Sequence, residues 1–165
     1  MTASFIPVRQ RHPATYVLAG GLIAGTLDMT YACTFWALKA SVPVQRIFQS
    51  VAAGLLGKAS FEGGAATAVL GLGLHYFIAT TMSVVYYLGA RRWPVLWQRP
   101  VICGTGYGLI LYGVMNYVVV PLSRAGHGGA KDPLWVGLSI VVHMFLIGMP
   151  IALATSAAVR RTRND

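Results

Sequence analysis

Charged residues are scarce in this sequence, and carboxylates are the scarcest of them. Of the 165 residues only 10% are charged, and just four are Asp or Glu. A soluble domain usually carries about a quarter charged residues. So few carboxylates nearly exclude paired-carboxylate catalysis, and the sequence has no nucleophile elbow, phosphate-binding glycine loop or Cys-x-x-Cys. The sequence does not decide whether the protein is an enzyme, but it favours a protein without enzyme activity.

Cysteine is also rare, with Cys33 and Cys103 as its two examples. Counted from the middle of the apolar runs that contain them, the two differ in depth by roughly 20 Å. A disulfide requires Cα atoms within about 7 Å. We therefore predict that the two thiols do not pair with each other.

What the sequence has instead is four long apolar runs, at about 15–38, 64–90, 101–121 and 134–158. The last three contain no Lys, Arg, Asp or Glu, and the first contains only Asp28. About 20 apolar residues cross a bilayer core as a helix, which satisfies its own backbone hydrogen bonds. We predict an all-α membrane protein, a four-transmembrane-helix bundle over 15–158, with cytoplasmic tails at 1–14 and 159–165.

The connection after the first run has a helical pattern of its own. Val44, Ile47, Phe48, Val51 and Leu55 recur at helical spacing, with Gln45, Arg46, Gln49 and Ser50 opposite them. We predict an amphipathic helix over about 43–57. It either lies in the outer membrane interface or packs across the end of the bundle.

The positions of the 13 basic residues explain the net charge of +9 better than nucleic-acid binding does. They lie between and beyond the apolar runs, where they contact lipid headgroups. With both termini inside, the cytoplasmic segments hold eight of them and the outer segments five. We predict a multi-pass protein of the bacterial inner membrane, oriented N-in/C-in, whose main partner is the lipid bilayer.

Small residues are spaced for close helix packing in two runs. Gly21 and Gly25 lie four apart in the first, and Gly104 and Gly108 in the third. Such pairs let helix backbones approach closely. We expect them to pack helices within the bundle, or to form the face of a homodimer or of a membrane complex.

The sequence also contains weak signs of an internal duplication. Setting His75 on His143 aligns Leu74–Ile78 with Val142–Leu146, and setting Asp28 on Asn116 superimposes two glycines. We hypothesise two copies of a helical hairpin related by a pseudo-twofold axis along the membrane normal.

One strongly polar side chain lies near the middle of each run: Asp28, His75, Asn116 and His143. All four are expected at similar depth. A carboxylate at a helix centre opposes insertion by about 2.5 to 3.5 kcal/mol, so Asp28 needs a partner, a proton or water. In the structural interpretation, which the sequence favours slightly, these groups are interhelical hydrogen bonds of a structural or accessory protein.

Three functional interpretations of this polar layer stay open. Asp28 and a histidine form a proton or ion relay, since imidazole titrates near neutral pH. Alternatively, His75 and His143 are axial ligands of a b-type haem, which requires two imidazoles on facing helices. In the third, the layer lines a small-molecule pocket at the interface between the two repeats. A closed zinc site is less well supported, because no set of four ligands is recognisable.

Three stretches, Leu18–Asp28, Gln49–Gly57 and Met115–Ser123, together resemble a family of small uncharacterised bacterial four-helix inner-membrane proteins. The resemblance covers most of the chain. It implies a four-helix membrane fold and transfers no activity or ligand.

Overall fold

Four long helices make up the computed structural model, which describes residues 12–126 and 132–164. The bounds are α1, Pro13–Ala40; α3, Gly64–Arg92; α5, Pro100–Val114, which continues through η2, Met115–Val119, into α6, Val120–Leu122; and α7, Pro133–Val142, which continues through η3, His143–Gly148, into α8, Met149–Asn164. Each of the four is long and apolar enough to cross a membrane. The predicted all-α bundle of four apolar helices is confirmed. Most of the tail at 1–14, the loop residues 127–131 and Asp165 lie outside the described residues.

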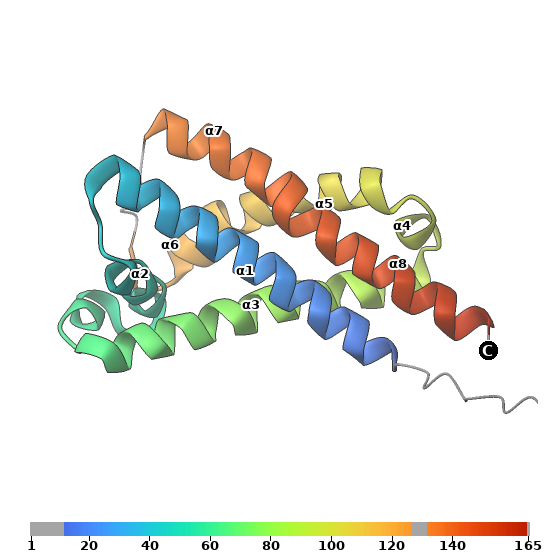
Figure 1. Ribbon diagram of the computed structural model, residues 1–165, viewed down its shortest axis with the longest axis horizontal. Coiled ribbons are helices and arrows are strands. Elements are labelled where there is room, and N and C mark those ends of the chain that lie inside the picture. The colour runs from blue at the N-terminus through green and yellow to red at the C-terminus, as the bar shows by residue number, and fades with distance from the viewer. Residues whose placement is uncertain (1–11, 127–131, 165) are drawn as a thin grey trace, which may run out of the picture.

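The four helices run lengthwise side by side (Figure 1). The first turn of α1 and the last turn of α8 lie at one end of the bundle, together with the short helix α4, Val95–Gln98. We call this the terminal end. Helix α1 packs against α3 and α8, and α5 packs against η3 and α8. Because the number of spans is even, both ends of the helical region lie on the same side of the membrane.

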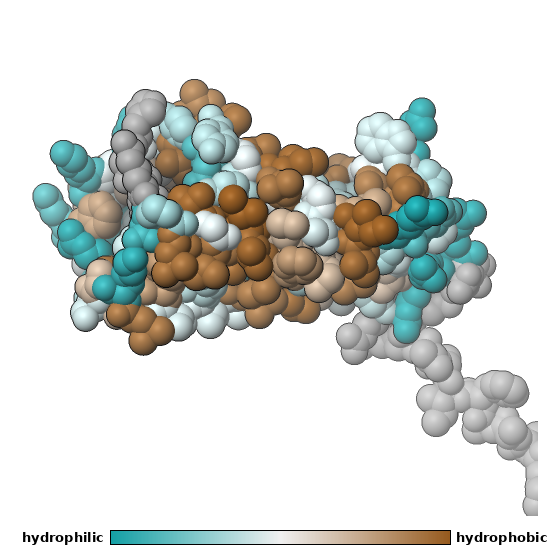
Figure 2. Space-filling model, turned by 90° about the horizontal axis from the view of Figure 1, so that it is seen from above, coloured by the Kyte–Doolittle hydropathy of each residue, from teal (hydrophilic) through white to brown (hydrophobic). Residues whose placement is uncertain are grey.

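The surface is divided into an apolar middle and hydrophilic ends (Figure 2). Large apolar side chains along the four spans are exposed: Phe77 is 69%, Ile102 70% and Ile110 61% exposed. Water would make this costly, whereas lipid tails solvate such side chains at no cost. The chain is therefore a multi-pass integral membrane protein whose flanks contact the lipid bilayer.

Close backbone contacts hold the helices together. A Cβ on Gly21 would lie 2.7 Å from the Cα of Thr80, and one on Gly25 would lie 3.1 Å from the Cβ of Ala79. On α5, a Cβ on Gly104 would lie 3.0 Å from the Cα of Met149, and one on Gly108 would overlap the carbonyl oxygen of His143. Both glycine pairs therefore face helices of the same chain and are not free to form a dimer face.

Helix α2, Val44–Leu56, lies across the other end of the bundle, which we call the α2 end, and is seen nearly end-on in Figure 1. It packs mainly against α3 and is followed by η1, Gly57–Phe61. The sequence pattern placed Gln49 on the face away from the apolar residues. Instead Gln49 is buried, and its amide donates to Gly64 O at 3.0 Å. The apolar residues Val44 and Leu55 are exposed, which suits the membrane interface.

The third span, α5–η2–α6, and the fourth span, α7–η3–α8, each contain a π-helical segment that ends close to a proline. The amide of Val120 donates to Met115 O just before Pro121, and the amide of Met149 donates to Met144 O just before Pro150. Proline lacks an N–H and collides with the preceding turn, so the ladder of hydrogen bonds is interrupted there. The two widened turns begin next to Asn116 and at His143, and they shape the interior of the bundle.

Candidate functional site

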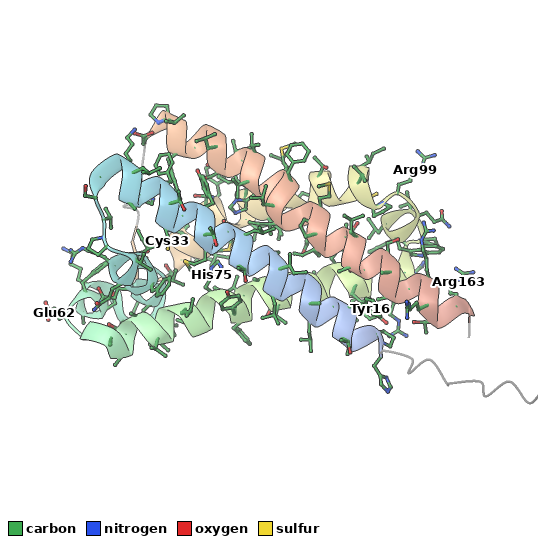
Figure 3. All side chains as sticks on the ribbon, in the orientation of Figure 1. Tyr16, Cys33, Glu62, His75, Arg99 and Arg163 are labelled. Carbon is green, nitrogen blue, oxygen red and sulfur yellow. The ribbon has the colours of Figure 1, made fainter. Side chains whose placement is uncertain are left out.

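One cavity of about 230 Å³ is lined by all four polar side chains that the sequence singles out. Asp28 comes from α1, His75 from α3, Asn116 from η2 and His143 from η3. Each of the four spans therefore contributes one of these four side chains. We call this space the polar cavity; His75 is labelled in the interior of the bundle in Figure 3. Most of its other lining residues are apolar or small, among them Ala24, Ala32, Val51, Ile78, Ala79, Met82 and Ile147.

Asp28 and His75 face each other across the α1–α3 contact. The Nε2 atom of His75 lies 2.8 Å from Gly25 O and 4.0 Å from Asp28 Oδ2. Because a carbonyl oxygen can only accept, we assign a proton to Nε2 of His75. Within the described residues the Asp28 carboxylate has no hydrogen-bond partner, and 26% of its side chain is accessible. The carboxylate therefore faces the cavity without a group that neutralises it.

The opposite wall has its own hydrogen bonds. His143 Nδ1 lies 2.8 Å from Ser139 O, one turn earlier, which assigns the proton to Nδ1 and leaves Nε2 as an acceptor. The Ser139 hydroxyl lies 3.3 Å from the Tyr31 hydroxyl, and Asn116 donates through Nδ2 to Tyr112 O. The polar groups on this side are thus partly satisfied within the protein.

A cluster of aromatic rings lies beside the polar cavity, toward the last turn of α1 and the first turn of α7. Tyr31 stacks on Trp135 with centroids 5.1 Å apart, and Phe35 and Trp36 also contact Trp135. Beyond them, Lys39 forms an ion pair with Asp132, which caps α7 by accepting the amide of Trp135. The Lys39 ammonium holds the pKa of Asp132 below its usual range, helped by that amide. The cluster ties the end of α1 to the start of α7.

Sequence reasoning did not place Tyr31 or Trp135 at the site. Tyr31 follows Asp28 by three residues and so lies on the same side of the helix, which was an available signal. Trp135 lies near the start of its apolar run, where tryptophan is typical of the membrane interface. Its second role depends on how α7 packs against α1, which no local pattern encodes.

The polar cavity does not fit a haem. It is smaller than the roughly 300 to 1,000 Å³ of usual organic ligand pockets. His143 keeps Nε2 free, but Nε2 of His75 is occupied by Gly25 O. Residues 12–126 and 132–164 also contain no group of three or more His, Cys, Asp or Glu side chains that would hold a metal ion. The two cysteines are free thiols.

No family model, no curated protein and no solved structure matches this chain. The resemblance to small bacterial membrane proteins is therefore supported only in its general part, the four long apolar helices.

Proposed function

We propose that this membrane protein binds a small organic ammonium ion in the polar cavity and exchanges it for a proton across the membrane. One observation carries the proposal: an Asp28 carboxylate without a hydrogen-bond partner in the described structure opens into a mainly apolar cavity built from all four spans. A carboxylate inside a membrane is costly and typically marks an ion or substrate path.

The walls of the cavity favour an organic cation over an inorganic one. Besides the carboxylate, the Tyr31 and Trp135 rings line the space, and aromatic faces attract ammonium groups. A dry cavity of about 150 Å³ holds benzene. A cavity of about 230 Å³ therefore fits one ring, or a chain of similar size, that carries a short amine.

Proton exchange follows from the same carboxylate. In the proposed exchange the site holds either a proton or the cation, because a neutral carboxyl group or a carboxylate paired with a cation costs less to bury in a membrane than a lone carboxylate. When an ammonium ion binds, Asp28 releases that proton and forms an ion pair with the ligand. The Nε2–H of His75 donates to Gly25 O and lies 4.0 Å from Asp28 Oδ2, so any proton that His75 accepts goes to its other ring nitrogen, Nδ1.

A structural or accessory role is the second candidate, and the contact between His75 and Gly25 O favours it. That hydrogen bond joins α1 to α3 whether or not a ligand binds. Such interhelical bonds stabilise membrane bundles by about 0.6 to 2 kcal/mol. In this case the cavity would be a packing defect.

The test is binding of phenethylammonium to the purified full-length protein, measured by calorimetry and by uptake into proteoliposomes. The wild type should bind it, prefer it to the neutral isostere phenethyl alcohol, and release protons on binding. Asp28→Asn should lower the affinity at least tenfold, because an ion pair in an apolar site is lost. Asp132→Asn is the matched control, since it removes a carboxylate outside the cavity and keeps a good helix cap. Equal affinity for the amine and the alcohol would contradict the proposal.

We also propose that the protein lies in the bacterial inner membrane with both termini in the cytoplasm. The excess of Lys and Arg in the segments at the terminal end supports this orientation, because cytoplasmic loops are enriched in these residues. In intact cells, a membrane-impermeant thiol reagent should label Lys58→Cys and not Arg92→Cys, each made in a background without native cysteines. Labelling of position 92 alone would reverse the topology.

A further inference from the structure

A second cavity, of about 300 Å³, lies at the terminal end of the bundle, where α3, α4 and α8 meet. Arg91 from the end of α3 and Arg163 from the end of α8 both line it. Tyr87, Trp97 and Val159 form much of the remaining wall. We call this space the arginine pocket. It lies far from the polar cavity along the bundle, as the labels of Arg163 and His75 show in Figure 3.

Two arginines of this region contact an aromatic ring, and neither forms an ion pair with a carboxylate of the described residues. The guanidinium carbon of Arg163 lies 5.3 Å from the centroid of the Trp97 ring, and that of Arg160 lies 5.9 Å from it. Of the acidic side chains that the structure describes, Glu62 lies at the α2 end (Figure 3), Asp132 pairs with Lys39 and Asp28 faces the polar cavity. Among the acidic residues of 12–126 and 132–164, none therefore pairs with the arginines of this pocket.

The wall that carries these cations is fixed by hydrogen bonds. The buried Ser156 hydroxyl donates to Trp97 O at 2.7 Å, and Arg160 Nε lies 3.2 Å from the same hydroxyl. This arrangement anchors α4 to α8 and sets the indole as a platform. Two arginines on separate helices, with donors in a fixed fork, match the oxygen atoms of a phosphate group.

We propose that the arginine pocket binds the phosphate of an anionic phospholipid at the membrane surface. The site is at the edge of the apolar band, since Leu88 is 55% and Trp93 59% exposed nearby. A lipid phosphate at that level would meet Arg91 and Arg163, while its glycerol and upper acyl carbons would lie against Val159 and the tyrosine and indole rings. Basic pockets between transmembrane helices at the cytoplasmic side bind acidic headgroups in this manner.

The experiment is a lipid titration of the full-length protein by native mass spectrometry in a neutral detergent. Wild-type protein should bind one phosphatidylglycerol more tightly than phosphatidylcholine. Each arginine near the surface contributes about fivefold, so R91Q/R163Q should weaken phosphatidylglycerol binding by about 25-fold. K58Q/R124Q is the matched control, because it removes two exposed charges from the α2 end. Equal losses in the two double variants would show nonspecific attraction and overturn the site.

Two further measurements keep the outcome decisive. R91K/R163K retains the charge without the planar fork and should recover part of the affinity, which also shows that the fold is intact. Millimolar inorganic phosphate should not displace the lipid; full displacement would identify a soluble phosphate as the ligand and contradict the lipid proposal. Asp28→Asn should leave lipid binding unchanged, so the two proposed sites can fail independently.

Discussion

His75 on α3 contacts α1 at two points, with its Nε2 2.8 Å from Gly25 O and 4.0 Å from the Asp28 carboxylate. The close approach of the two helices makes this possible, because Gly25 has no side chain between α1 and the Ala79 methyl group of α3. A histidine with 14% of its side chain accessible therefore connects the packing of the bundle to the one carboxylate in its interior.

The substitution Asp28→Asn tests whether Asp28 stabilises the fold or serves ligand binding. We expect Asp28→Asn to raise the free energy of unfolding in detergent by about 1 kcal/mol, because functional sites are commonly less stable than they could be. The carboxylate has no hydrogen bond to lose within the described structure, and the amide is neutral. Thermal unfolding followed by circular dichroism measures the change. A loss of 2 kcal/mol or more would instead identify Asp28 as a structural residue.

The bond between His75 and Gly25 O can be tested with a pair of variants. His75→Leu removes the donor and should lower the free energy of unfolding by about 1 kcal/mol. His75→Gln keeps an N–H donor of similar reach and should restore most of that loss. Chemical denaturation in mixed micelles gives both values. If the two variants are equally stable, the hydrogen bond contributes nothing to the bundle.

Gly108 on α5 is the position where the backbones of the third and fourth spans approach most closely. A methyl group there would overlap the carbonyl oxygen of His143, which is backbone and has little room to move. Gly108→Ala should therefore destabilise the protein by about 3 kcal/mol. Gly106→Ala is the control on the same helix, because a methyl group at that position would have no atom within 4 Å, and it should stabilise the helix by about 0.5 to 1 kcal/mol. Similar effects of the two substitutions would mean that this contact is not tight.

Local sequence was sufficient to predict the bundle. Apolar runs of more than 20 residues have one favourable environment, and the structure has four long apolar helices, Pro13–Ala40, Gly64–Arg92, Pro100–Leu122 and Pro133–Arg163. Counting residues also put Asp28, His75, Asn116 and His143 at similar depth. That all four line one cavity depends on the rotation of each helix about its axis, which depth does not determine.

Two other features could not be predicted because they depend on packing between elements. Gln49 belongs to the polar face of α2 and yet is buried, because its amide donates to Gly64 O and Thr67 Oγ1 on α3. The arginine pocket brings together residues about 70 positions apart, Arg91 and Arg163, at the meeting of α3 and α8. The internal duplication stays a prediction.

The ion pair between Lys39 and Asp132 should make stability depend on acid pH. The pKa of Asp132 is lowered in the folded protein, first by the hydrogen bond from Lys39 and then by the Trp135 amide. A carboxyl group with a depressed folded pKa stabilises the folded state above its unfolded pKa, near 3.9, and this contribution is lost as the pH falls through the folded value. The wild type should therefore lose more thermal stability between pH 5 and pH 2.5 than Asp132→Asn, which keeps the helix cap and has no charge to lose. The measurement is the difference in melting temperature between the two proteins at each pH, which removes the effect of the other carboxylates. A difference that does not change across this range would mean that the ion pair at the α2 end adds nothing to the closure of α1 onto α7.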